Sequence, residues 1–143
     1  LLVGTNLRAE APLLNVRLRK AVMKGGARAW GIGPAVDLAY PVTWLGDDAA
    51  LLAALPADVA AAFAAAQRPA MLVGMGALAT PGLHAAAVAA SHRLGMIRPD
   101  WNGFNVVHTA AARAGALRLG LAVPGGVGSL IGATDLKALF LLL

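Results

Sequence analysis

Short apolar runs that each end in glycine recur along this chain, with helical patterns between them. The runs and the glycines that follow them are Leu1–Val3 with Gly4, Ala27–Ile32 with Gly33, and Ala70–Val73 with Gly74. Strands that alternate with helices form a mostly parallel sheet with helices on both faces. We therefore predict an α/β fold with a doubly wound, mostly parallel sheet. Such sheets bind ligands in the crevice beyond the carboxyl ends of their strands, so chemistry is expected at the turns after these runs.

Helices are expected where a first-turn proline or a capping side chain precedes apolar residues spaced three or four apart. Pro12 suits the first turn of a helix to Lys24, which Gly25-Gly26 ends, with Leu14 and Leu18 on its apolar face. Similar signals predict helices from Asp47 or Asp48 to Leu55, Pro56 to Gln67, Leu83 to Leu94, and Asn105 to Gly115. Loops are expected over 34–41 and 124–132, and a final strand over Ala138–Leu143.

Both ends of the chain have the composition of buried strands. The chain opens on Leu1-Leu2-Val3 and closes on Leu139-Phe140-Leu141-Leu142-Leu143. Only 13% of the residues are charged, against about 25% in typical soluble domains, and 59% are hydrophobic. This balance favours a piece buried inside something larger. We therefore expect residues 1–143 to be an internal fragment of one domain, cut at both ends.

Residues for metal binding and for nucleophilic catalysis are scarce. The chain has no Cys, which excludes cysteine-held iron–sulfur clusters, Cys-based zinc sites and disulfides within it. His84, His92 and His108 match no ligand spacing, and Glu10 is the only Glu. Ser91 precedes His92, so on a helix the two side chains point about 100° apart. No metal site and no catalytic residue are predicted in this fragment.

Two glycine-rich motifs invite a nucleotide interpretation. Gly74-Met75-Gly76-Ala77-Leu78-Ala79 fits G-x-G-x-x-A after a strand, but Pro81-Gly82 is expected to interrupt before the helix begins. A ribose-binding acid at the end of a following strand is also missing, so a tight structural turn is favoured. Gly125-Gly126-Val127-Gly128-Ser129 lacks the lysine of a P-loop and is interpreted as a flexible loop.

Membrane and nucleic-acid binding are both disfavoured. Residues 69–92 carry no formal charge over a length that could span a bilayer, but Pro81-Gly82 divides them. No signal peptide is recognised at the start. The net charge of +5 is concentrated in residues 1–34, where aromatic residues for base stacking are not interleaved. A solvated helix face bearing Arg17, Lys20 and Lys24 explains the charge better than nucleic acid does.

The segment Trp101–Ala111 follows no helical or strand period. Asn102-Gly103 is expected to form a tight turn with Trp101 and Phe104 buried on either side of it. His108 is placed one turn into the next helix, where a local hydrogen bond is expected rather than catalysis.

Four segments, in order, resemble the carboxyl-terminal part of the large iron–sulfur subunit of NADH–quinone oxidoreductase, respiratory complex I. They are Leu2-Val3-Gly4-Thr5-Asn6 with Glu10-Ala11-Pro12; Ile32-Gly33-Pro34 with Asp37-Leu38-Ala39-Tyr40-Pro41 and Leu45-Gly46; Gly74-Met75-Gly76-Ala77-Leu78; and Trp101-Asn102-Gly103-Phe104-Asn105-Val106-Val107-His108-Thr109-Ala110-Ala111. The resemblance covers essentially the whole chain and implies the molybdopterin-oxidoreductase fold.

The resemblance also implies a setting. The family's large subunit relays electrons from NADH towards quinone through 4Fe-4S and 2Fe-2S clusters held by Cys in its amino-terminal part. This chain would be a structural section without a redox centre, and inactive alone. Its partners would be the rest of its own subunit and other peripheral-arm subunits, on the cytoplasmic face of the inner membrane or the matrix side in mitochondria. The Ala- and Arg-rich composition is compatible with a bacterial source.

Two alternatives remain open at this point. One is a true molybdopterin-dependent oxidoreductase, similar to formate dehydrogenase, which needs cofactor contacts at the strand ends. The other is the central domain of a thiamine-diphosphate enzyme, which the stretch Arg68-Pro69-Ala70-Met71-Leu72-Val73-Gly74 faintly resembles. The second alternative does not predict the Trp101–Ala111 segment.

Comparison with molybdopterin enzymes implies that the pterin site is vestigial here. The turn that reads Gly-Ser/Thr-Asn-Pro in those enzymes is matched by Gly4-Thr5-Asn6, but Leu7 replaces the proline. Their next strand ends in Asp-Pro-Arg, where this chain has Gly33-Pro34-Ala35. Asp accepts hydrogen bonds from a guanine edge and Arg pairs with phosphate, whereas Gly33 and Ala35 do neither. We therefore expect no bound pterin.

Overall fold

The computed structural model describes residues 1–122, 124–135 and 137–138. The chain divides into two compact units, Leu1–Thr109 and Ala110–Leu143. The strand expected over Ala138–Leu143 falls outside the described residues except for Ala138, which lies in neither a helix nor a strand. The first unit carries the parallel sheet and the turns at which chemistry is expected.

The first unit is built on a five-stranded sheet. The strands are β1 (Leu2–Val3), β2 (Trp30–Ile32), β3 (Thr43–Gly46), β4 (Met71–Val73) and β7 (Phe104–Val106). They lie in the order β3-β2-β1-β4-β7, and every neighbouring pair is parallel. This arrangement confirms the predicted α/β fold with a mostly parallel, doubly wound sheet.

The strand order reverses at β1. From β1 the chain moves outward to β2 and β3 on one side, then returns to build β4 and β7 on the other. The boundary between β1 and β4 is therefore the topological switch point, where sheets of this class place their ligands. In register, Leu2 lies opposite Gly31 of β2 and Leu72 of β4. The switch point consequently lies beyond Val3 and Val73, at Gly4 and Gly74.

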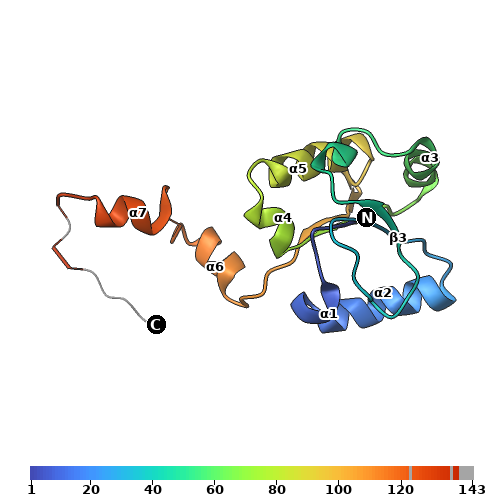
Figure 1. Cartoon of the computed structure of the whole chain (residues 1–143), viewed down its shortest axis with the longest axis horizontal. Helices are drawn as coiled ribbons and strands as arrows, with labels where there is room; N and C mark the ends of the chain where they lie inside the picture. The colour runs from blue at the N-terminus through green and yellow to red at the C-terminus, as the bar shows by residue number, and fades with distance from the viewer. Residues whose placement is uncertain (123, 136, 139–143) are drawn as a thin grey trace. The chain divides into compact units, whose positions relative to one another are not determined.

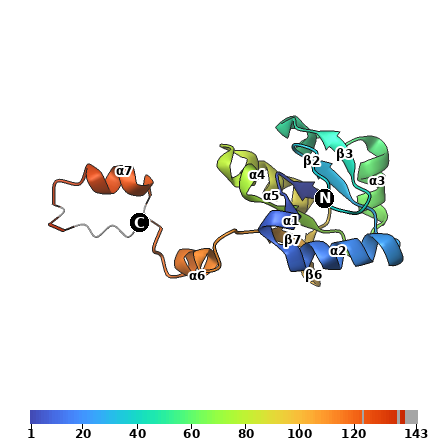
Figure 2. The ribbon, with the colours of Figure 1, turned by 60° about the horizontal axis from the view of Figure 1, so that its bottom comes forward.

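Helices cover both faces of the sheet, as Figures 1 and 2 show. One face carries α1 (Leu7–Glu10) and α2 (Pro12–Lys24), and the other carries α3 (Ala57–Ala65), α4 (Met75–Ala79) and α5 (Leu83–Arg93). Successive side chains of each strand point to opposite faces of the sheet, so each strand contributes apolar residues to the core on both faces. Val3 and Val73 pack towards the α3–α5 face, while Leu2 and Leu72 pack towards the α1–α2 face.

The two cores differ in composition. Beneath α3 and α5, the core includes Phe63 stacked at a tilt on Trp30, with ring centroids 5.2 Å apart, and the small residues Ala87 and Ala90 of α5. Small side chains let α5 approach the sheet closely. Beneath α2, the half-buried leucines of the predicted apolar stripe pack on a cluster that contains Leu38 and Tyr40. The buried setting raises the pKa of the Tyr40 phenol to about 12.

Most predicted helices are present, with tighter bounds. The helix over Pro12–Lys24 ends at Gly25 as predicted, and its basic residues Arg17, Lys20 and Lys24 are exposed. Asp48, one of the two expected caps, accepts a hydrogen bond from the Ala50 amide at 2.8 Å and begins the short 3-10 helix η1 (Ala49–Leu52). The helices opened by Pro56 and Leu83 are α3 and α5.

Two local predictions in this unit are wrong, and one strand was not predicted. The helix expected from Asn105 is instead β7, because residues 104–106 pair with β4 at the sheet edge. Strand β3 was not predicted, since its end residues are exposed and it lacks the apolar signature of the inner strands. The expected Asn102-Gly103 turn is wrong as well. Asn102 belongs to strand β6 (Trp101–Asn102), which pairs antiparallel with β5 (Ile97–Arg98), and Gly103 connects that pair to β7.

The second unit contains α6 (Arg113–Arg118) and α7 (Gly126–Ile131). The loop expected over 124–132 is thus largely helical. The Ser129 hydroxyl lies within hydrogen-bond distance of the carbonyl oxygens of Pro124 and Gly126 and can donate to either one. This contact helps the glycine-rich turn to form. Leu117, Leu119, Leu121 and Ile131 are all more than half exposed. Over the described residues, no helix is long and apolar enough to cross a membrane.

Candidate functional site

The carboxyl ends of β1 and β4 meet in direct backbone contact. Gly4 has φ +52°, and its carbonyl accepts a hydrogen bond from the Gly76 amide at 3.0 Å. A Cβ on Gly4 would lie 2.4 Å from the Ala77 nitrogen. The first turn of α4 therefore packs on the end of β1 with no room for a side chain. The expected gap between Gly74 and the next helix is wrong, because α4 begins at Met75.

A carboxylate bridges the two strand ends. Glu10 Oε1 accepts a hydrogen bond from the Asn6 amide at 2.7 Å, and Oε2 accepts one from the Met75 amide at 2.9 Å. Met75 is the first residue of α4, where the helix dipole favours a negative charge. Hydrogen bonds from backbone amides to a carboxylate are stronger than those between neutral groups. Glu10 thus joins the β1 turn to the start of α4.

Thr5 lies against the same point. The residue is 7% exposed, and its Oγ1 has no hydrogen-bond partner among the described residues. A Cβ on Gly74 would lie 2.3 Å from the Thr5 Cβ and 2.7 Å from Glu10 Oε2. Only glycine fits at position 74 without displacing one of these groups. The cradle is therefore formed by Gly4 and Gly74, with Thr5 and Glu10 filling it.

Gly33 brings the end of β2 to the same edge. It has φ +124°, and a Cβ there would lie 3.3 Å from the Gly4 Cα. The structure thus places together the two segments expected to mark the pterin site, Gly4-Thr5-Asn6 and Gly33-Pro34-Ala35. Pro34 and Ala35 are exposed, and their side chains carry no hydrogen-bonding group. Asn6 caps α1 by accepting from the Arg8 amide at 3.2 Å.

The sequence interpretation missed two polar features at this edge. Glu10 appeared only as an isolated acid, because nothing in its spacing indicated a bond to Met75, 65 residues away. Arg8 forms an ion pair with Asp37 at 3.2 Å, and its Nη1 also donates to the Asp37 carbonyl. Both side chains of that pair are more than half exposed, so the pair adds little stability.

The histidines do not assemble into a site. His108 was expected in a helix, but it lies in the segment that follows β7. Its buried Nδ1 has no hydrogen-bond partner among the described residues. His84 packs edge-on against Phe104, with ring centroids 6.0 Å apart. The buried Ser91 hydroxyl donates to the Val88 carbonyl and is not paired with a base. Across the described ranges, no group of three His, Asp or Glu is placed to hold a metal ion.

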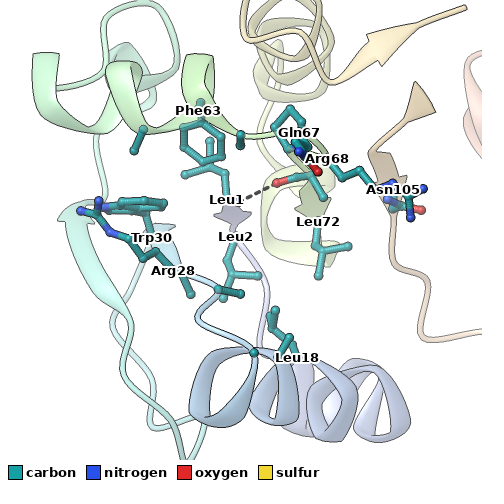
Figure 3. A pocket seen from close by; sticks show the side chains of 18 of the residues that line it. Leu1, Leu2, Leu18, Arg28, Trp30, Phe63, Gln67, Arg68, Leu72 and Asn105 are labelled. Atoms are coloured by element: carbon teal, nitrogen blue, oxygen red, sulfur yellow. Dashed lines mark hydrogen bonds between the residues drawn. The ribbon is translucent and has the colours of Figure 1, made fainter. Parts of the chain in front are cut away.

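A cavity lies at the opposite edge of the sheet, at the amino ends of the strands. It has a volume of about 1020 Å³ and is lined mainly by apolar groups, with Arg28 stacked on Trp30 at its rim (Figure 3). The Leu1 nitrogen donates a hydrogen bond to the Ala70 carbonyl at 2.7 Å. Arg68 stacks on Trp101 at the same end. This cavity is separate from the switch point.

Comparison with known proteins agrees with this architecture. The family model for molybdopterin oxidoreductase matches residues 1–143. The chain is 34% identical over 127 residues to the NADH-ubiquinone oxidoreductase 75 kDa subunit of Reclinomonas americana, covering 85% of this chain and 18% of that protein. It is 35% identical to the mitochondrial NADH dehydrogenase [ubiquinone] iron-sulfur protein 1 of Solanum tuberosum, over 85% of this chain and 17% of that protein.

A bacterial relative gives the same result. An NADH-quinone oxidoreductase subunit of Rickettsia typhi is 32% identical over 84% of this chain and 19% of its own length. The chain thus spans about a fifth of the curated relatives that it matches. The family match takes in the Arg68–Gly74 stretch that suggested a thiamine-diphosphate enzyme, so that alternative is abandoned. From its sheet topology and the full-length family match, the chain belongs to the molybdopterin oxidoreductase family.

Proposed function

We propose that the chain is a structural section of the large iron–sulfur subunit of an NADH–quinone oxidoreductase. Its relatives of 32–36% identity are named as subunits of that enzyme, and each match covers most of this chain. On this proposal, the 143 residues are an internal part of a longer subunit. The rest of that subunit holds 4Fe-4S and 2Fe-2S clusters and passes electrons from NADH towards quinone. The chain supports that path by packing and has no redox centre or activity of its own.

The residues at the switch point do not fit the pterin that the family name implies. The carboxylate of Glu10 already accepts a hydrogen bond from the backbone amide at the start of α4. This is the position at which a dinucleotide-binding fold binds a phosphate. A second negative charge would be repelled there by the Glu10 carboxylate. Gly33 and Ala35 offer no side chain to a guanine edge or a phosphate. This self-occupied strand-end site is the observation that carries the proposal of a non-catalytic section.

The apolar surfaces of the first unit suit burial within a large assembly. The cavity of about 1020 Å³ at the amino ends of the strands has aliphatic and aromatic walls, including Leu18, Phe63 and Leu72. Contiguous apolar surface that is open to solvent commonly marks a contact site for another protein segment. We assign this cavity to packing against the rest of the chain's own subunit. The setting is the peripheral arm, on the cytoplasmic face of the inner membrane or its matrix-side counterpart.

One observation favours the runner-up, a true molybdopterin-dependent oxidoreductase. The frame Gly4-Thr5-Asn6 is retained, and the Thr5 hydroxyl within it is buried without a partner among the described residues. A ligand that bonded to Thr5 would explain that hydroxyl. For such a ligand to bind, Glu10 would have to leave the Met75 amide.

Membership of the complex is tested by isolation from the native host. An affinity tag is placed on the protein that contains this chain, and membranes are solubilised in mild detergent. We expect the tagged protein to migrate in one native-gel band with NADH–quinone reductase activity and with NADH-oxidising subunits identified by mass spectrometry. The same tag on an unrelated cytoplasmic protein is the control. A tagged protein that migrates apart from this activity would contradict the proposal.

A further inference from the structure

We propose that Glu10 is a built-in anion that occupies the phosphate position of the switch-point site and closes it to anionic ligands. The inference rests on the proposed function, because it explains how a pterin frame persists without its ligand. Glu10 comes from the end of α1, on the opposite face of the sheet from α4, and reaches across the strand ends. Each of its two carboxylate oxygens accepts a hydrogen bond from one backbone amide, Oε1 from Asn6 and Oε2 from Met75.

The pattern of donors is that of a phosphate cradle. Doubly wound sheets bind the phosphates of a dinucleotide at the first strand–helix turns of the switch point, through backbone amides and glycines that allow close approach. Here the close approach is evident at Gly4 and Gly74, where any side chain would collide with backbone or with Glu10 itself. A carboxylate with two oxygens on two amides reproduces the charge and the acceptors that a phosphate would bring.

Thr5 gives an observation that does not depend on the helix start. Its side chain is more than nine-tenths buried against Gly74, and its hydroxyl has no partner among the described residues. A buried hydroxyl without a hydrogen-bond partner destabilises the folded state, because the group loses its hydrogen bonds to water on folding and gains none in return. Glu10 bonds to two neighbouring amides and leaves this third polar group unused. Thr5 therefore adds a buried, unsatisfied hydroxyl group on the residue that packs against Gly74, beside the carboxylate that bonds to the Met75 amide.

The inference predicts that removing the carboxylate opens the site. The Glu10→Ala variant of the full chain should unfold about 5 °C lower than wild type in a thermal shift assay, as expected when a charge-assisted cap is lost. Inorganic phosphate should then restore roughly half of the loss in a saturable manner, since a ligand that binds only the folded state stabilises it. Wild type should show no saturable response to phosphate, with sodium chloride as the ionic-strength control.

Two variants control for packing and for general anion effects. Glu10→Gln keeps the side chain's size, so the site stays filled and phosphate should have no effect. Asp48→Ala removes an exposed carboxylate that also accepts a backbone amide, from Ala50, but has no glycine cradle around it. Its loss of stability should not be restored by phosphate. An equal phosphate response in Asp48→Ala, in Glu10→Gln or in wild type would overturn the inference, as would a Glu10→Ala variant that phosphate fails to stabilise.

A measurement on wild type covers the case in which Glu10→Ala does not fold. In ¹H–¹⁵N spectra of the full chain titrated with inorganic phosphate, the Asn6 and Met75 amide signals should stay in place, because Glu10 holds both amides. Saturable shifts of those two signals would show an open site and refute the inference. Neither experiment depends on membership of the respiratory complex, so failure here is separable from failure of the proposed function.

Discussion

The contact between β1 and α4 can be tested by adding one methyl group. In Gly4→Ala, the new Cβ would lie 2.4 Å from the Ala77 nitrogen and 2.9 Å from the Ala77 Cβ, so the first turn of α4 has to move. Overpacking of this kind costs about 1–3 kcal/mol. Holding alanine at a left-handed φ of +52° adds about 1–2 kcal/mol. The free energy of unfolding should therefore fall by about 2–5 kcal/mol in total.

Gly26→Ala is the matched control. Gly26 also has a left-handed φ, of +70°, but no heavy atom lies within 4 Å of its added Cβ. That variant should lose only the backbone contribution of about 1–2 kcal/mol. Pulse proteolysis across a urea series measures both values at low protein concentration. If Gly4→Ala is no more destabilising than Gly26→Ala, then α4 does not pack on the end of β1 as described, and the switch-point geometry is wrong.

Two further predictions concern buried polar groups. Trp101→Phe removes the indole N–H that donates to the Pro69 carbonyl at 2.8 Å, and urea unfolding should show a loss of about 0.5–1.5 kcal/mol; an unchanged midpoint would contradict that bond. Thr5→Val replaces a hydroxyl without a partner among the described residues, so the urea midpoint should be equal to or higher than that of wild type, and a clear drop would reveal a missed partner.

The inner part of the sheet could be predicted from the sequence because its strands are buried on both faces. Leu1–Val3 and Ala70–Val73 are continuous apolar runs bounded by glycine, which is the signature of inner parallel strands. Helix α2 could be predicted for an equally local reason, since Pro12 and Gly25 mark its ends. Edge strands lack this signature. Strand β3 has exposed ends, and β7 alternates polar and apolar residues in a stretch that Asn105 made similar to a helix start.

The candidate site was only half predictable. A glycine directly after a strand indicates that another backbone segment approaches closely there. In agreement with this, Gly33 at the end of β2 lies against Gly4 at the switch point. The occupant of that point could not be predicted. The bond from Glu10 to Met75 joins residues 65 positions apart and forms only because β1 and β4 pair side by side. Sequence periodicity describes neighbours on one element, whereas this contact depends on the strand order of the whole sheet.

We propose that this chain is a structural section of a respiratory oxidoreductase and holds no pterin. The most direct test is the metal and pterin content of the protein that contains the chain, purified from its native host. Molybdenum and tungsten are measured by mass spectrometry, and extracted pterin is measured as its fluorescent oxidised derivative in the same sample. Each is expected to be far below one equivalent per protein. Molybdenum or tungsten near equimolar with the protein, together with pterin, would refute the structural role and establish the molybdopterin-enzyme alternative.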